Sequence, residues 1–488
     1  MKLEATDTIA RHWIDDEWVE SDTVSESINP ATGEVLGRWE DGGETEARAA
    51  IAAARRAFDT SPWSRDRSLR NKALIEMADA FDAHADELGP LVTKENGKKL
   101  AEGILEATIP GVTLRHAAGQ ALTDTGIAAE VAPGQWFSTY AEPAGVVGVI
   151  VPWNSPVVLL IRSLAPALAA GNTVAVKMPG QTALVANFVS RIIAEVESLP
   201  GGVVNIFTES GNKGSPYLVA SPDVQVISYT GSVAVGRLVA AAGAPTLKRM
   251  NLELGGKTPM IVFDDADFDA AIPILVGAVT TFAGQFCMTG SRILVQRGVA
   301  DELRSRLAEA FEHVRVGNGL DPDTDMGPLI DKTAVARVDG MVEAALAYAT
   351  PIARGGPVTD GALAAGAFYR PALLEVEDVG AEIVQQEVFG PVATFEVFED
   401  EADAIARANA TEMGLSAAIF TNNLNISRRV TRGVAAGTVW TNTWAGINDG
   451  FAEGGFKQSG IGRLRGPLAI TEFQEAKTVV HAVPLLET

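Results

Sequence analysis

A single cysteine, Cys287, lies in the segment Gly284-Gln285-Phe286-Cys287, 34 positions (287 − 253) after Glu253. Glu253 is part of the Gly-rich stretch Leu252-Glu253-Leu254-Gly255-Gly256-Lys257. A thiolate can act as a nucleophile and a carboxylate as a general base, so the two residue types suggest covalent catalysis. An unpaired cysteine is more often a small buried hydrophobic residue, so isolation alone leaves both interpretations open.

A candidate phosphate site lies between Thr230 and Gly236, where a predicted strand leads into a predicted helix. Backbone N–H groups at such a turn, together with the helix dipole, attract an anion. Gly231 would let a ligand approach the backbone, Ser232 could donate its hydroxyl, and Gly236 would allow close packing. The segment does not match G-x-G-x-x-G, and a glycine at a strand-to-helix junction is at least as often only a turn.

Two further polar residues come at the ends of predicted strands. Asn154 follows Pro152-Trp153, and its amide could donate to an oxyanion, although capping the turn before Ser155-Pro156 is the commoner role. Lys177 closes the strand 173–177, where ligands gather in open parallel sheets. A ribose or phosphate contact would suit this lysine, whereas an ordinary surface position is the default.

The elements that must position these residues indicate an α/β protein. Residues 44–58 and 71–88 have helical composition or spacing. Short apolar, β-branched runs predict strands at 145–151, 173–177, 203–207, 224–229 and 259–263. Helix-compatible segments separate the first four, as in a parallel sheet, and a second alternation runs from about 271 to 445. At 488 residues, the chain is expected to fold as two Rossmann-like lobes.

Composition excludes several classes of function. The net charge of −23 and the lack of a basic cluster argue against nucleic acid. The longest apolar runs are too short to span a membrane, and no signal peptide is visible at the N-terminus. One cysteine cannot form an intramolecular disulfide framework, which favours the reducing cytoplasm.

Seven motifs together resemble the aldehyde dehydrogenase superfamily, and the resemblance extends from Asn29 to Val479. In order they are Pro152-Trp153-Asn154, Leu168-Ala169-Ala170-Gly171-Asn172-Thr173, Tyr229-Thr230-Gly231-Ser232, Leu252-Glu253-Leu254-Gly255-Gly256-Lys257, Gly284-Gln285-Phe286-Cys287, Glu387-Val388-Phe389-Gly390-Pro391 and Gly455-Phe456-Lys457-Gln458-Ser459-Gly460-Ile461-Gly462-Arg463. Their joint order and spacing favour Cys287 as the nucleophile.

The resemblance implies a mechanism and a set of site residues. Cys287 would attack an aldehyde, Asn154 and the Cys287 backbone N–H would hold the oxyanion, and Glu253 would activate water to hydrolyse the thioester. Glu387 would hold the nicotinamide ribose. No metal is expected. The residues expected around NAD or NADP are Pro152, Trp153, Lys177, Gly180, Gly211, Gly231, Ser232, Gly236, Leu254, Glu387 and Phe389.

The chain departs from that family where the adenosine ribose would bind. Many NAD-dependent members carry a glutamate three positions after the strand lysine, whereas this chain reads Lys177-Met178-Pro179-Gly180. Losing the carboxylate would remove repulsion toward a 2′-phosphate, and Lys177 would remain available as a cation. We therefore expect activity with both NAD and NADP, and a shift toward NAD in Gly180→Glu.

A second departure concerns the aldehyde tunnel, where Arg162, Trp444 and Glu453 are the expected substrate residues. Some relatives place large aromatic residues at the positions of Arg162 and Glu453. A buried guanidinium needs a partner, which could be a substrate carboxylate or phenolate, or Glu453. Both pairings stay open, and either predicts a polar, carboxylated or aromatic aldehyde.

The resemblance also predicts domains and assembly. Residues 1–122 and 143–254 would form the dinucleotide-binding domain, and 255–458 the catalytic domain. Residues 123–142 and 459–488 would form a β arm and C-terminal segment that joins subunits into a homodimer or homotetramer. Two alternatives remain, an acylating enzyme that passes the thioester to coenzyme A and a non-catalytic structural member; retention of Glu253 favours water as the acceptor.

Overall fold

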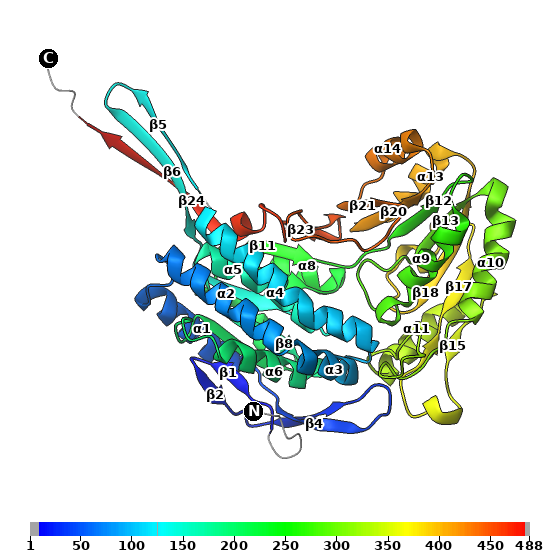
Figure 1. Ribbon diagram of the computed structural model, residues 1–488, viewed down its shortest axis with the longest axis horizontal. Helices are drawn as coiled ribbons and strands as arrows, with labels where there is room; N and C mark the ends of the chain where they lie inside the picture. The colour runs from blue at the N-terminus through cyan, green and yellow to red at the C-terminus, as the bar shows by residue number, and fades with distance from the viewer. Residues whose placement is uncertain (1–8, 124, 484–488) are drawn as a thin grey trace.

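The first four apolar, β-branched runs form the centre of an eight-stranded sheet in a computed structural model that describes residues 9–123 and 125–483 (Figure 1). Strands β9, β8, β7, β10 and β11 are parallel neighbours, so their carboxyl ends share one edge of the sheet. The order is β2 (Glu17–Val19), β1 (His12–Ile14), β9 (Val204–Glu209), β8 (Thr173–Pro179), β7 (Val146–Ile150), β10 (Val226–Thr230), β11 (Arg249–Glu253) and β23 (Gly460–Ile461).

Helices cover both faces of this sheet, as both faces of a parallel sheet require. One apolar core lies under α2 (Arg67–Ala83), α3 (Ala85–Asn96), α4 (Leu100–Thr123), α5 (Pro156–Ala170) and α6 (Ala183–Ala194). The core on the other face includes side chains from α1 (Glu44–Thr60), α7 (Gly214–Ala220) and α8 (Val233–Gly243). The single helix expected over 71–88 is divided, because His84 leaves the helical conformation between α2 and α3.

A second lobe holds a seven-stranded sheet that is parallel except at one edge. Its order is β14 (Thr350–Ala353), β17 (Ala372–Glu375), β18 (Val392–Phe398), β13 (Arg292–Gln296), β12 (Pro259–Val262), β20 (Ser416–Phe420) and β21 (Thr438–Thr441). The helices of this lobe are α9 (Phe268–Thr280), α10 (Ala300–Glu312), α11 (Lys332–Ala345), α12 (Glu382–Gln385), α13 (Glu401–Ala408) and α14 (Leu424–Gly433).

Short elements complete the described chain. The two-stranded pairs are β3 (Val24–Ile28) with β4 (Val35–Glu40), β15 (Gly356–Pro357) with β16 (Tyr369–Arg370), and β19 (Met413–Gly414) with β22 (Phe456–Lys457). The 3-10 segments are η1 (Gly180–Thr182), η2 (Ala244–Thr246), η3 (Thr281–Gly284), η4 (Arg297–Val299), η5 (Gly361–Leu363) and η6 (Ile470–Phe473). Within the described ranges, no helix combines the length and apolar character that a membrane span needs.

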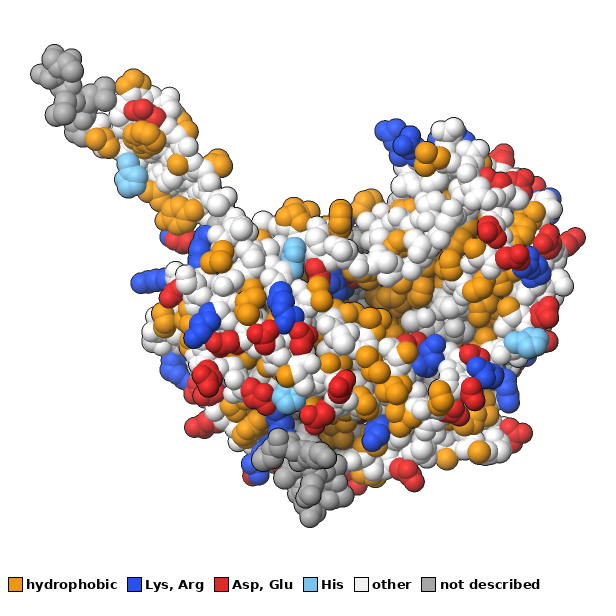
Figure 2. All heavy atoms as spheres, viewed as in Figure 1, with side chains coloured by type: hydrophobic (Ala, Val, Ile, Leu, Met, Phe, Trp, Pro, Cys, Tyr) orange, Lys and Arg blue, Asp and Glu red, His pale blue; other side chains and the backbone are white. Residues whose placement is uncertain are grey.

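A three-stranded β arm projects away from both lobes (Figure 1). It consists of β5 (Ile127–Ala132), β6 (Gln135–Pro143) and β24 (Gln474–Ala482), with β6 in the middle. Hydrophobic side chains lie along its surface (Figure 2), and Ile127 is 78% exposed. Such a surface is unusual for a segment that faces only water.

The positions of β12 and β23 divide the chain between the two sheets. The run at 259–263 forms β12 of the second sheet, within the range 255–458 that was expected to form the catalytic domain. Strand β23 lies in the segment 459–488 that was expected to accompany the arm, yet it pairs with β11 in the first sheet. The segment therefore closes the sheet edge next to Glu253 before it reaches the arm.

A buried ion pair ties together two central strands of the second lobe. Arg292 on β13 donates through Nε and Nη2 to the two carboxylate oxygens of Glu396 on β18, at 2.8 and 2.7 Å. Both side chains are almost fully buried. Arg292 also begins the strand that follows the cysteine loop, so the pair fixes the end of that loop.

We predict that Glu396→Gln lowers the free energy of unfolding by about 3–5 kcal/mol, because it leaves the buried charge of Arg292 without its partner. Chemical or thermal unfolding of the purified protein measures the change. Glu399→Gln is the matched control, since Glu399 pairs with Arg297 on the exposed surface and its loss is expected to change stability little. Equal stability of Glu396→Gln and wild type would contradict the prediction.

Candidate active site

The strand ends of the first sheet bring Asn154 and Glu253 to one edge. Glu253 is the last residue of β11 and is in register with Thr230, the last residue of β10. Strand β7 ends at Ile150, and Asn154 follows it before α5 begins. Ligands of open α/β sheets bind outside such carboxyl ends.

Cys287 reaches this edge from the second lobe on a sharply turned segment after α9. Phe282, Ala283 and Gly284 all have left-handed backbone conformations, with φ of 53°, 53° and 69°. A side chain at Gly284 would clash, because a Cβ there would lie 2.2 Å from the carbonyl carbon of Gly390. Non-glycine residues in this conformation are strained, and such strain persists where the surroundings hold it in place.

Residues of α4 and of the segment before it, in the first lobe, help to fix this strained turn. Glu102 Oε1 accepts a hydrogen bond from the backbone N–H of Phe282 at 3.2 Å. The Lys98 ammonium lies 3.9 Å from the centroid of the Phe282 ring, within cation–π range. Lys98 is itself buried and paired with Glu106. The turn before Cys287 is therefore fixed by charged groups of the other lobe.

Asn154 contacts the cysteine loop directly. Its Nδ2 donates to the backbone oxygen of Gln285 at 3.0 Å, and the side chain is buried. Among the described residues, the backbone N–H of Cys287 has no hydrogen-bond acceptor. The structure thus places a side-chain amide on the backbone two residues before Cys287 and leaves the Cys287 N–H free, and donors of these two kinds can stabilise an oxyanion.

Glu253 is a buried carboxylate with unused bonding capacity. Only 4% of the residue is exposed, and its Oε1 has no hydrogen-bond partner among the described residues. Burial raises the pKa of Glu253 to about 7, the nearby Glu453 carboxylate adds to the rise, and Arg162 opposes it. A carboxyl group with this pKa can exchange a proton near neutral pH.

Arg162 is engaged by protein groups on three sides. Its Nη1 lies 2.6 Å from Glu453 Oε1 and 3.8 Å from Glu253 Oε2, and its Nη2 donates to Thr230 Oγ1 at 3.0 Å. Of the two pairings that the sequence left open, the structure shows the ion pair with Glu453.

The pair extends into a chain of alternating charges. Glu453 Oε2 accepts from Arg465 Nε at 2.8 Å, and Arg465 in turn contacts Asp449. Although burial opposes ionisation of Glu453, Arg162 and Arg465 hold its pKa below the ordinary value. A cavity of about 20 Å³, the space of roughly one water, adjoins Arg162, Asp449 and Arg465.

The same charges act on the nucleophile. Burial raises the pKa of the Cys287 thiol, Arg162 opposes the rise, and the carboxylates of Glu453, Glu387 and Glu253 reinforce it. The resting side chain is therefore a neutral thiol, although the residue is partly exposed and accessible. Its proton must leave before or during attack on a substrate.

The expected cofactor residues nearest to Cys287 come from both lobes. The rings of Trp153 and Phe389 contact edge to face, with centroids 5.5 Å apart. Glu387 Oε1 accepts the backbone N–H of Gly256 at 3.2 Å. Burial raises the pKa of Glu387 to about 7, and Pro152 lies half-buried beside Trp153.

The remaining expected cofactor residues lie along the first sheet. Ser232 caps α8 by accepting the N–H of Val235, and a Cβ on Gly236 would lie 2.6 Å from Leu254 Cδ2. A side chain at position 231 would clash, because a Cβ there would lie 2.2 Å from the Tyr229 hydroxyl. Lys177 is half-buried on β8, Gly180 begins η1, and Gly211 is exposed after β9.

Trp444, the third expected substrate residue, lies on the other side of the cysteine loop. Its Nε1 donates to the backbone oxygen of Met288 at 2.9 Å, and its ring contacts Phe286 edge to face. The aromatic surface therefore packs around the residues that flank Cys287.

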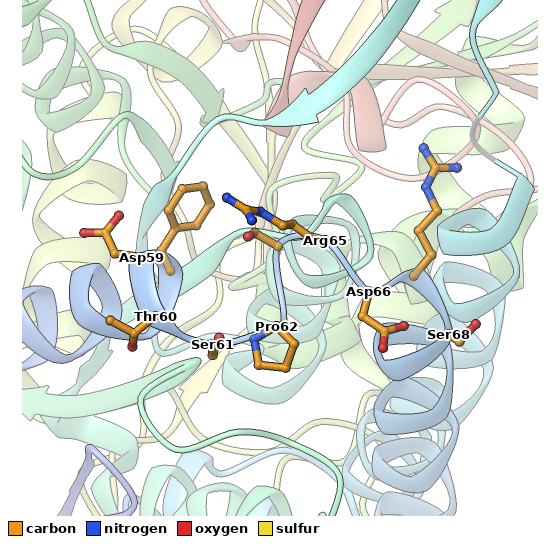
Figure 3. Close-up of a pocket in the computed structure, with 10 residues that line it drawn as sticks. Asp59, Thr60, Ser61, Pro62, Arg65, Asp66 and Ser68 are labelled. Carbon is orange, nitrogen blue, oxygen red and sulfur yellow. The ribbon is translucent and has the colours of Figure 1, made fainter.

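A large open depression lies elsewhere and does not include these groups. It has a volume of about 810 Å³ and follows the α1–α2 connection from Phe58 to Ser68 (Figure 3). Its lining is polar and solvent-facing, with Asp59, Arg65 and Asp66 spread apart. The volume of this depression would make it a candidate active site. The catalytic residue types, however, come together at the sheet edge near Cys287, and the candidate site is therefore placed there.

Several contacts of the site have no signal in the sequence, although Gln285 and Thr230 themselves lie within motifs of the family. Gln285 anchors Asn154, Thr230 and Arg465 complete the environment of Arg162 and Glu453, and Glu102 holds the turn before Cys287. The partners lie tens or hundreds of positions apart, and each is an ordinary polar residue in its local context.

Comparison with known proteins identifies the family to which this chain belongs. The profile of the aldehyde dehydrogenase family matches residues 18–479. The chain is 36% identical over 472 residues to betaine aldehyde dehydrogenase of Bacillus subtilis, covering 96% of each chain. It is 35% identical over 479 residues to phenylacetaldehyde dehydrogenase of Pseudomonas fluorescens, covering 96% of this chain and 94% of the relative.

Comparison with solved structures gives the same family. The crystal structure of betaine aldehyde dehydrogenase from Staphylococcus aureus in complex with NAD+ superposes with a TM-score of 0.95 at 35% identity, over 98% of this chain and 96% of that one. The match in sequence and in three dimensions covers both lobes and the arm. This chain therefore belongs to the aldehyde dehydrogenase family, a family of NAD(P)-dependent oxidoreductases.

Proposed function

We propose that this enzyme oxidises a polar or aromatic aldehyde to its carboxylic acid through a thiohemiacetal and a thioester on Cys287. The observation that carries the proposal is the contact across the lobes, in which Asn154 bonds the loop of Cys287 while Glu253 lies at the same sheet edge with a free carboxylate oxygen.

In the proposed first half-reaction, Cys287 Sγ gives its proton to solvent water and attacks the carbonyl carbon. The new C–S bond leaves a negative charge on the carbonyl oxygen, and Asn154 Nδ2 and the Cys287 N–H stabilise it. When bound, NAD(P)+ supplies the hydride acceptor. Loss of hydride from the thiohemiacetal carbon re-forms the C=O bond and leaves a thioester on Cys287.

In the second half-reaction, Glu253 removes a proton from a water molecule. The hydroxide attacks the thioester carbon and displaces the Cys287 thiolate, so the acid leaves and the nucleophile is restored. The unpaired Glu253 Oε1 supports this role, because a buried carboxylate oxygen without a protein donor is a natural acceptor for water.

The residues present fit a dinucleotide. Only a glycine at position 255 leaves room for Glu387, because a Cβ there would lie 2.2 Å from Glu387 Oε2. Since Oε1 accepts the Gly256 N–H, Oε2 remains as an acceptor for a ribose hydroxyl. The N-terminus of α8 at Ser232 offers positive potential further along the sheet, and Lys177 on β8 supplies an ammonium group that can donate to a hydroxyl.

The Arg162–Glu453 pair narrows the proposed substrate class. Both terminal nitrogens of Arg162 already donate to protein oxygens, and two carboxylates lie beside them. A substrate carboxylate would meet this negative field, so the wall serves a neutral polar or aromatic aldehyde better than a semialdehyde acid.

We also propose that the arm joins subunits into a homodimer or homotetramer. Its outer strands have free edges, and Ile127, Trp136 and Val480 are exposed hydrophobic residues. Sheet edges and apolar surface of this kind are normally covered by another chain. The single cysteine also fits a reducing compartment such as the cytoplasm.

Cys287→Ala is expected to abolish oxidation of every aldehyde while leaving the affinity for the cofactor nearly unchanged, because only the covalent step is removed. Absorbance of the reduced cofactor measures turnover with a panel of neutral, aromatic and carboxylated aldehydes, with and without coenzyme A. Substantial turnover by this variant would refute the role of the thiol, and a requirement for coenzyme A would refute hydrolysis.

Glu253→Gln is expected to slow deacylation more than acylation, which gives a burst of reduced cofactor followed by slow turnover. In wild type, the rate should fall below about pH 7, because protonation of Glu253 removes the base. That acidic limb should disappear in the variant. Rapid-mixing kinetics between about pH 5 and pH 9 tests this prediction. A wild-type steady-state rate in the variant would refute the role of Glu253.

Light scattering at micromolar concentration is expected to give a mass of a dimer or tetramer. Replacing Ile127 and Val480 together by serine should shift the mass toward the monomer, because both side chains are exposed on the arm. A monomeric wild type would contradict the proposed assembly.

A further inference from the structure

The position of the missing ribose-binding glutamate is filled by an aromatic ring. Trp39 on β4 is buried and packs against Gly180, and a Cβ at position 180 would lie 2.8 Å from Trp39 Cη2 and 2.9 Å from Ser210 Cβ. Any side chain at position 180 would have to displace the indole. The shift toward NAD that the sequence predicts for Gly180→Glu would therefore require the Trp39 indole or Ser210 to move.

A different carboxylate lies next to this position. Asp41 follows β4 two residues after Trp39, and Ser210, which contacts the space at Gly180, also binds Asp41. Asp41 Oδ1 accepts the Ser210 N–H at 2.9 Å, and Oδ2 accepts the hydroxyls of Ser210 and Ser25, the latter at 2.8 Å. Three donors hold the carboxylate in place, and Oδ1 keeps a lone pair for a further hydroxyl.

Asp41 also changes the charge around Lys177, the cation on which use of NADP would depend. Burial lowers the pKa of Lys177, and the carboxylates of Glu209 and Asp41 oppose this shift because both lie within its electrostatic reach. Glu209 is buried and caps α7 by accepting the N–H of Gly214 at 2.8 Å. With two carboxylates and one ammonium, the region carries a net negative charge.

We propose that Asp41 replaces the ribose-binding glutamate of the β8 turn, accepts a hydroxyl of the adenosine ribose, and makes this enzyme select NAD+ over NADP+. The inference rests on the proposed function, since it takes the adenosine end to lie at Lys177 and Gly180. A carboxylate in this place accepts a hydrogen bond from a ribose hydroxyl and repels a phosphate. One residue therefore both favours NAD+ and disfavours NADP+. Under this proposal, the activity expected with both cofactors becomes much weaker with NADP+ than with NAD+.

Calorimetric titration of the full-length protein with NAD+ and with NADP+, without aldehyde, tests the proposal. Wild type is expected to bind NAD+ at least about a hundredfold more tightly than NADP+. Asp41→Asn should weaken NAD+ binding by about tenfold and lower the ratio of the two dissociation constants by at least about tenfold, because a charge-assisted hydrogen bond and a repulsion are both removed.

Asp22→Asn is the matched control, because Asp22 is an exposed carboxylate between β2 and β3 and its removal changes the net charge equally. It should leave both affinities unchanged. Asp41→Ser, which keeps an oxygen for the Ser210 N–H, repeats the test if Asp41→Asn melts at a lower temperature.

Equal wild-type affinity for the two cofactors overturns the inference, as does an unchanged affinity ratio in both Asp41 variants. Failure to bind either cofactor would instead contradict the proposed function. Loss of aldehyde oxidation with normal NAD+ binding would contradict the proposed chemistry and leave the role of Asp41 standing, so the two failures are distinguishable.

Discussion

A buried guanidinium, that of Arg162, connects the parts of the site that come from different regions of the chain. It lies on α5, bonds to Thr230 at the end of β10, approaches Glu253 at the end of β11, and pairs with Glu453, which precedes β23 in the chain. A charge without water must be compensated by nearby opposite charges. That requirement links the position of Glu253 to the stretch that begins at Glu453 and leads into β23, which pairs with β11.

The same charge chain sets the chemical state of the site. Arg162 opposes the rise in pKa that burial imposes on Glu253 and Cys287, while Glu453 acts in the opposite direction on both. Because Glu453 is shared with Arg465, its own pKa stays low and its charge persists. The wall beside Cys287 is thus polar yet internally paired.

The two lobes are joined by polar contacts at the place where catalysis would occur. Asn154 holds the loop of Cys287 from one side, and Glu102 and Lys98 hold the left-handed turn at Phe282 from another. A nucleophile must be positioned within a fraction of an ångström to profit from fixed oxyanion donors. Strain at the turn and anchoring across the lobes together supply that precision, whereas either lobe alone lacks half of the constellation.

The sequence by itself determined the α/β class, the strands that begin at Val146, Thr173 and Val204, and the family, and it singled out Cys287, Glu253 and Asn154 as the candidate catalytic residues. Strand patterns follow from local hydrophobic runs, and rare motifs keep their order along the chain, so both are readable in one dimension. Only the tertiary structure decided that Arg162 pairs with Glu453 and that Trp39 and Asp41 lie in the region of Gly180. These depend on contacts between residues up to 291 positions apart. Such contacts form because packing and the desolvation of charge act through space, and neither leaves a periodic trace in the order of the residues.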